Sequence, residues 1–225
     1  MEMYSDAQSV ITESTNDSII KTFFRMFLGL FATAIISFLT YSTGAIYQMA
    51  AFFPVLAIAE IVLVLIFSFA FRKLSPTAVT ILFFAYAILN GLTLSTIFIA
   101  YDIGTIFYAF GSTTLLFGAL ALYGYVTKKD MSKFGTILLV GLLVGIVVSV
   151  INLFVGSSLV DIALNWVMLA IFCGLTIFDI QKIKRIGEYG EHEREKLYVY
   201  CAMDLYLDFI NIFLRLLQIF ARRRD

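Results

Sequence analysis

Long apolar runs alternate with short polar clusters along nearly the whole chain. Each run is about twenty residues long, the length that an α-helix needs to cross a hydrocarbon layer of roughly 30 Å. The pattern predicts seven such spans, at residues 23–42, 51–71, 77–100, 104–126, 134–155, 160–181 and 197–220. Backbone polar groups inside lipid must bond within their own segment, and the runs are too long for barrel strands. We therefore expect seven transmembrane helices.

The composition indicates a chain whose solvent is lipid. Hydrophobic residues make up 61% of the sequence and charged residues 14%, and there are only two prolines. A sequence of this kind is too apolar for a single water-soluble core. The formal net charge is zero, so nothing in the charge balance points to a nucleic-acid partner. We predict an all-α polytopic membrane protein whose main partner is the lipid bilayer.

A polar segment precedes the first span. Residues 1–20 are rich in Ser, Thr and Asp, and they lack the basic start and the small-residue cleavage site of a signal peptide. We interpret them as a polar cytoplasmic arm and residues 21–225 as one transmembrane domain of seven helices. In the fifth span, Gly141, Gly145 and Ser149 form a row of small residues that would let another helix approach closely.

The Lys and Arg residues predict the orientation of the chain. They occur at the start of the first span and in the loops after the second, fourth and sixth spans, whereas the three alternate loops contain none. Positive residues favour the cytoplasmic side, so we expect a cytoplasmic amino terminus. The short loops and the absence of a retention signal favour a bacterial plasma membrane. Seven crossings would leave the basic tail at Arg222 outside, so the side of the tail stays open.

Four acids within the predicted spans are candidates for a functional role, because an ionised carboxylate at the helix centre costs about 2.5 to 3.5 kcal/mol. Glu60 is in the second span, Asp179 in the sixth, and Asp204 and Asp208 are in the seventh. Acids at such positions usually face the interior of a bundle or a water-filled path. Asp179 alone is ambiguous, because it lies near the inner end of its span and could reach the interface or pair with a basic neighbour.

The seventh span carries a continuous polar stripe. Asp204, Asp208, Asn211 and Arg215 are spaced four, three and four residues apart, which places them on one side of a helix. The stripe needs partners, so we expect this helix at the centre of the others. Asp208 and Asp179 fall at similar depth on consecutive antiparallel helices. Two carboxyls that meet in a low-dielectric setting share one proton and titrate as a unit, with one apparent pKa raised toward neutrality.

Three runs of sequence resemble the signatures of the transmembrane Bax-inhibitor-motif family in its bacterial branch. They are FDIQKIK at residues 178–184, YLDFINIFLRLLQIF at 206–220 and NGLTLSTIF at 90–98. The resemblance extends over essentially the whole chain beyond the arm. It implies a fold in which six helices surround the seventh, and a passive, pH-sensitive calcium leak gated by a hydrogen-bonded pair of aspartates.

The resemblance also implies roles for particular residues. It assigns the aspartate pair to Asp179 and Asp208, which would hold Ca²⁺ transiently, and the Asn that follows the second aspartate to Asn211. It makes Arg72 the candidate for a basic latch on the aspartates. Ca²⁺ is then the permeant ion and H⁺ the regulator, with no tightly bound cofactor. The polar positions expected to support the path are Glu60, Asp204, Asn211 and Arg215.

Two other classes of protein stay open. An intramembrane aspartyl protease also uses one aspartate on each of two neighbouring helices. However, Asp208 follows Leu205, Tyr206 and Leu207 rather than the glycines of presenilin-type enzymes, so we expect no enzyme. The stronger alternative is a membrane interaction protein, such as a regulator of a membrane protease or a stress pathway. In that case the aspartates only stabilise the bundle, and the arm contacts other membrane proteins.

Overall fold

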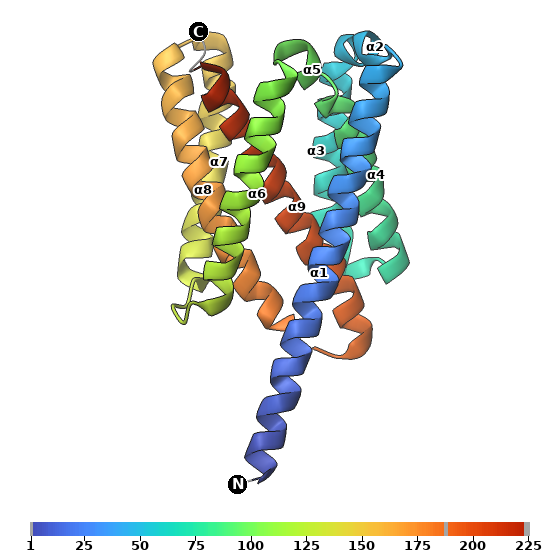
Figure 1. Cartoon of the computed structure of the whole chain (residues 1–225), viewed down its shortest axis with the longest axis vertical. Helices are drawn as coiled ribbons and strands as arrows, with labels where there is room; N and C mark the ends of the chain where they lie inside the picture. The colour runs from blue at the N-terminus through green and yellow to red at the C-terminus, as the bar shows by residue number, and fades with distance from the viewer. Residues whose placement is uncertain (1, 187–188, 223–225) are drawn as a thin grey trace. The chain divides into compact units, whose positions relative to one another are not determined.

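The computed structural model describes residues 2–186 and 189–222, and all side chains within them except those of residues 2–14 and of His192. The described residues form helices and no strand, and seven of the helical segments are long and apolar enough to cross a membrane. The predicted all-α polytopic fold is confirmed. The helices are α1 (Glu2–Ser42), α2 (Ile46–Ala51), α3 (Phe53–Ala70), η1 (Phe71–Lys73), α4 (Pro76–Leu94), α5 (Ile97–Ala100), α6 (Ile103–Val126), α7 (Ser132–Val155), α8 (Ser158–Lys184) and α9 (Glu191–Arg222) (Figure 1).

The chain divides into two compact units. Unit 1 consists of Met1–Asp102 and Ile183–Tyr206, and unit 2 of Ile103–Lys182 and Leu207–Asp225. Helix α9 therefore contributes its first part to unit 1 and its last part to unit 2. The aspartates at positions 179 and 208 both belong to unit 2.

Two helices of unit 1 have a proline in the first turn, where the missing N–H would have no partner. Pro54 is the second residue of α3, and Pro76 begins α4. The Ser75 side chain caps α4 by accepting a hydrogen bond from the backbone N–H of Ala78 at 3.2 Å. Helices α1 and α4 pack side by side (Figure 1). Their contact depends on Gly91, where a Cβ atom would lie 2.8 Å from the Thr33 carbonyl oxygen.

The third predicted span, residues 77–100, is interrupted in the structure. Helix α4 ends at Leu94, and the short helix α5 resumes at Ile97. The Ser95 hydroxyl donates to the Leu92 carbonyl at 2.6 Å, and the Thr96 hydroxyl donates to the Thr93 carbonyl at 2.7 Å. Hydroxyl side chains that bond nearby carbonyls compete with the helical hydrogen bonds, which accounts for the break.

In unit 2, glycines allow α6 and α7 to approach α8. A Cβ atom on Gly124 of α6 would lie 3.0 Å from the Ile177 carbonyl oxygen. On α7, Gly141 faces Ile171, and Gly145 leaves no room for a Cβ beside the Met168 sulfur. The row of small residues predicted in the fifth span is thus a close packing surface. Helix α7 ends at Gly156, whose φ of +68° is the left-handed conformation that glycine adopts readily.

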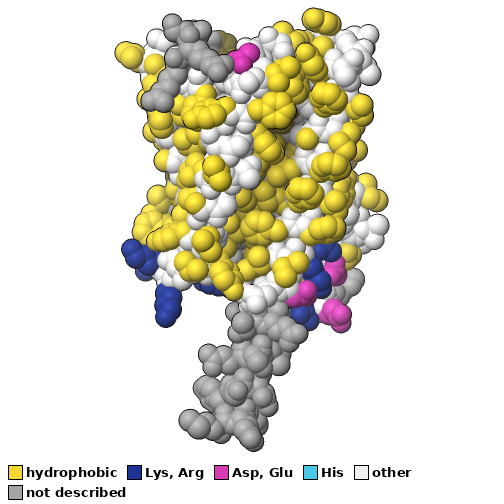
Figure 2. Space-filling view, viewed as in Figure 1, with side chains coloured by type: hydrophobic (Ala, Val, Ile, Leu, Met, Phe, Trp, Pro, Cys, Tyr) yellow, Lys and Arg dark blue, Asp and Glu magenta, His cyan; other side chains and the backbone are white. Residues whose placement is uncertain are grey.

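Burial distinguishes the seven spans. In α9, 67% of the most apolar window is buried, whereas the other spans range from 6% in α3 to 44% in α4. The prediction that the seventh span is an interior helix agrees with this burial. Elsewhere, hydrophobic side chains cover the visible sides of the helices, and Lys and Arg side chains gather near helix ends (Figure 2).

The predicted arm, residues 1–20, continues into the first span as part of α1. The candidate span within α1 begins at Thr15, and the side chains of residues 2–14 lie outside the described set. Asp17 pairs with Lys21 one turn later at 2.8 Å. The end of the basic tail, residues 223–225, also lies outside the described residues.

Candidate functional site

Helix α9 presents its polar stripe on the more accessible part of its surface. Its apolar positions, such as Leu205, Ile212 and Leu217, are fully buried. Between Cys201 and Gln218, the half-buried positions fall within an arc of about 100° around the helix. They are Asp204, Leu207, Asn211, Leu214, Arg215 and Gln218. The sequence correctly places Asp204, Asn211 and Arg215 on one side of the helix. In the structure, this side is the least buried part of α9 between Cys201 and Gln218, and α9 is the most buried of the seven spans.

Asp208 lies at the edge of this arc and is only 3% exposed. Asp208 interacts electrostatically with Cys173 of α8. A hydrogen bond joins the same two helices, from the Asn165 side-chain amide to the Arg215 carbonyl, at 3.2 Å. In unit 2, the last part of α9 therefore packs against α8.

Asp179 lies on the buried face of α8 and is 7% exposed. Its neighbours on that face are Thr176, Ile180 and Ile183, which are almost fully buried. The Lys182 ammonium group lies 3.9 Å from an Asp179 carboxyl oxygen. The predicted alternative, a basic partner on the same helix, is therefore present in the structure.

Both aspartates can be related to Cys173 of α8. Asp179 follows Cys173 by six residues on the same helix, a helical rise of about 9 Å. Asp208 of α9 interacts electrostatically with Cys173. Direct contact between the two carboxyl groups stays a prediction.

The other polar residues of the stripe have different surroundings. The Asn211 side chain donates to the Leu207 carbonyl of its own helix at 2.8 Å. The Nε atom of Arg215 is buried and has no hydrogen-bond partner among the described residues. Asp204 is half-buried and belongs to unit 1. The described residues contain no cluster of three or more His, Cys, Asp or Glu side chains that could hold a metal ion.

Arg72, the predicted latch, lies in η1 of unit 1, and its side chain is exposed. Its carbonyl oxygen accepts a hydrogen bond from the Lys196 ammonium group at 3.2 Å. The latch on the aspartates of unit 2 stays a prediction.

Glu60 belongs to a buried hydrogen-bond chain in unit 1 that the sequence does not reveal. The Tyr206 hydroxyl donates to the Asn90 side-chain oxygen at 2.9 Å, and the Asn90 amide donates to Glu60 at 3.3 Å. The Tyr206 hydroxyl also lies 2.7 Å from the Thr33 hydroxyl, and either of the two can be the donor. The Thr33 hydroxyl in turn donates to the carbonyl oxygens of Gly29 and Ala87, at 3.0 and 2.8 Å. This chain of hydrogen bonds joins α1, α3, α4 and α9. We name its four residues, Thr33, Glu60, Asn90 and Tyr206, the Tyr206 clamp.

The sequence gives only a weak indication of the Tyr206 clamp. Asn90 lies in the NGLTLSTIF run and Tyr206 begins the YLDFINIFLRLLQIF run, but Thr33 occurs in a segment that is mostly apolar. Tyr206 is also two residues from Asp208, about 200° around α9, so the two side chains point in nearly opposite directions. The clamp therefore fixes α9 from the side opposite the Asp208 carboxyl group.

Comparison with known proteins gives one family over nearly the whole chain. The family described as Inhibitor of apoptosis-promoting Bax1 matches residues 15–225. Inner membrane protein YbhL of Escherichia coli (strain K12) is 38% identical over 207 residues, which cover 88% of each chain. An uncharacterized protein of Borreliella burgdorferi is 32% identical over 232 residues, covering 100% of this chain and 99% of that protein. An uncharacterized membrane protein of Streptococcus pyogenes serotype M3 is 42% identical over 171 residues, covering 74% of this chain and 72% of that protein.

Proposed function

This chain belongs to the family described as Inhibitor of apoptosis-promoting Bax1 and is a multi-pass bacterial inner-membrane protein, and from that premise we propose that it is a pH-sensitive calcium leak. The proposed activity is passive conduction of Ca²⁺, with no chemical step and no bound cofactor. Asp179 and Asp208 form the gate.

The observation that carries the proposal is the burial of two acids on consecutive spans within one compact unit. Asp208 is 3% exposed and Asp179 is 7% exposed. Two carboxylates in such a setting do not both ionise readily, because each charge opposes the other and neither is solvated. One proton is therefore shared, and the pair changes its charge when that proton leaves.

Lys182 distinguishes the two acids. Its ammonium group, 3.9 Å from Asp179, stabilises a negative charge on that residue. In the proposed protonated state, Asp179 is ionised beside Lys182 and Asp208 holds the proton. Loss of the proton places two negative charges in unit 2, where they repel each other and attract a hard cation.

The half-buried stripe of α9 supports conduction along the same helix. Asn211, Arg215 and Gln218 continue from Asp208 toward the end of α9, on the part of its surface that is least covered. Ca²⁺ prefers six to eight oxygen ligands, and two carboxylates with a few amide oxygens supply fewer. A shortage of ligands suits a leak better than a tight binding site.

The proposal is tested by calcium flux into liposomes that contain only this protein, measured over a series of pH values. In Asp179→Asn and in Asp208→Asn, the midpoint of the flux–pH curve should move to lower pH. The reason is that the remaining carboxyl group no longer loses its proton beside a second negative charge. Asp130→Asn, which removes an exposed carboxylate between α6 and α7, should leave the midpoint unchanged.

Two outcomes would contradict the proposal. If the wild-type protein conducts no Ca²⁺ at any pH, the chain is not a leak by itself, and the interaction-protein hypothesis takes its place. If it conducts but both aspartate variants keep the wild-type midpoint, the gate lies elsewhere.

A further inference from the structure

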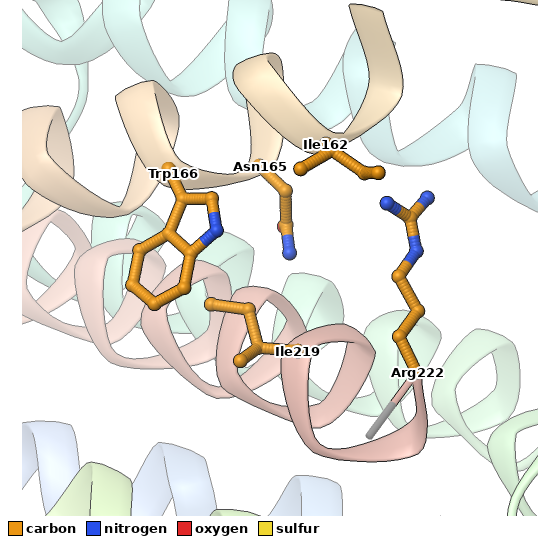
Figure 3. A pocket seen from close by; sticks show the side chains of 5 residues that line it. All are labelled: Ile162, Asn165, Trp166, Ile219 and Arg222. Carbon is orange, nitrogen blue, oxygen red and sulfur yellow. The ribbon is translucent and has the colours of Figure 1, made fainter. Parts of the chain in front are cut away.

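Unit 2 contains a pocket that the proposed gate does not use. Its volume is about 220 Å³. Three of its lining residues come from the start of α8 and two from the end of α9 (Figure 3). They are Ile162, Asn165, Trp166, Ile219 and Arg222.

The pocket lies near one end of both helices. Ile162 and Trp166 follow the first residue of α8 by four and eight positions, a rise of about 6 and 12 Å. Arg222 is the last residue of α9. Trp is enriched where a bilayer meets water, and Arg at a helix end reaches the headgroups. This position is therefore at the level of lipid headgroups and the upper parts of their acyl chains.

The pocket combines an apolar wall with a single cation. Trp166 is 56% exposed and Ile162 is 43% exposed, so both present apolar surface to the surrounding lipid. Arg222 is exposed and makes no ion pair with a described residue. The nearest acid in sequence to the α8 wall, Asp161, accepts a hydrogen bond from the Asn152 side chain of α7 at 2.6 Å, so its carboxylate is already engaged.

Asn165 also lines the pocket and joins its two walls (Figure 3). Its amide nitrogen donates to the Arg215 carbonyl at 3.2 Å, so α8 and α9 are tied together beside the pocket.

We propose that this pocket binds an anionic phospholipid of the phosphatidylglycerol type. The phosphate pairs with Arg222, and an acyl chain lies against Ile162, Trp166 and Ile219. Charge complementarity selects the anionic lipid, because a zwitterionic headgroup brings its own cation beside Arg222.

The pocket contains an intrinsic fluorescent probe, because Trp166 is the single tryptophan of the chain. The wild-type protein is placed in vesicles of brominated phosphatidylglycerol mixed with unlabelled phosphatidylcholine, and in vesicles with the bromine on the other lipid. Bromine quenches indole fluorescence on contact. We expect phosphatidylglycerol to associate about fivefold more strongly, the ratio that corresponds to about 1 kcal/mol for one basic residue near anionic lipid. Equal association of the two lipids overturns the proposal.

Two variants separate the pocket from the general charge of the tail. Arg222→Gln should abolish the preference, whereas Arg223→Gln/Arg224→Gln should keep it. Arg222 is exposed, and circular dichroism checks that its replacement leaves the helices intact. A preference that falls equally in both variants reflects the summed charge of the tail and overturns the assignment to this pocket.

The source of the phosphate is also tested. Inorganic phosphate in the buffer should not relieve the quenching by brominated phosphatidylglycerol, because it lacks the acyl chain that contacts Trp166. Relief of the quenching would show that the site recognises phosphate alone, against the proposal. None of these measurements involves calcium, so their outcome does not depend on whether the protein is a calcium leak.

Discussion

Buried polar side chains differ in whether their donor and acceptor atoms have hydrogen-bond partners. The Tyr206 hydroxyl has a partner on each side, whereas the Arg215 Nε atom has none among the described residues. A buried polar group without a partner costs about 1 to 3 kcal/mol. Arg215 belongs to the half-buried stripe of α9, where a water-filled path would supply the missing partner. The two groups therefore suit different roles, a structural tie for Tyr206 and a hydrated surface for Arg215.

The role of Tyr206 is tested by removing its hydroxyl. Tyr206→Phe deletes the donor to Asn90 and the hydrogen bond with the Thr33 hydroxyl, while the ring keeps its packing. We expect the free energy of unfolding in detergent to fall by about 1 to 3 kcal/mol, because buried partners lose their hydrogen bonds. Tyr108→Phe is the matched control, since the Tyr108 side chain is 64% exposed and should tolerate the change. Equal stability of the two variants would show that the clamp contributes nothing.

At the level of helices, the spans follow closely from the apolar pattern. The span predicted at residues 134–155 corresponds to α7 (Ser132–Val155), and the predicted limits of the second, third, fourth and sixth spans lie within three residues of the observed apolar segments. The first and seventh apolar segments begin eight and four residues before their predicted starts, at Thr15 and Glu193. Apolar length alone sets these limits, because a bilayer requires it. The break in the third span was not predictable from length. It depends on the Ser95 and Thr96 hydroxyls bonding their own backbone, and many helices tolerate such residues.

The packing of α1 on α4 gives a test of close helix contact. In Gly91→Ala, the added Cβ atom would meet the Thr33 carbonyl oxygen at 2.8 Å, so the two helices must separate. We expect a loss of about 1 to 3 kcal/mol in stability, the usual cost of overpacking. Gly118→Ala on α6 is the control, because a Cβ atom added there would have no other atom within 4 Å. It should be neutral or stabilising by up to about 1 kcal/mol, as alanine favours helices. A stable Gly91→Ala protein would contradict this packing.

For the whole molecule, the sequence predicts which side of a helix carries the acids better than it predicts which residues of other helices lie around them. The spacing of Asp204, Asp208, Asn211 and Arg215 places them on one side of α9 because helical geometry is local. The Tyr206 clamp draws its members from four separate helices, and no local pattern brings such segments together. The pocket at Trp166 likewise depends on how the start of α8 meets the end of α9.

The orientation of the chain in the membrane is a further prediction at this scale. Single cysteines are introduced at Ser157 or at Lys128, in a protein whose Cys173 and Cys201 are replaced by Ser. A membrane-impermeant maleimide should label position 157 in intact cells and position 128 only after permeabilisation. This result follows because the loop with Lys128 is basic and expected to face the cytoplasm. The reverse labelling pattern would invert the predicted topology.

The central claim is that Asp179 and Asp208 act as one titrating gate, and the double variant Asp179→Asn/Asp208→Asn tests it most directly. With both carboxyl groups gone, no shared proton remains to be released. We predict that calcium flux through this variant, compared with the wild type in the same liposomes, is independent of pH. A flux–pH curve with the wild-type midpoint in the double variant would contradict the account.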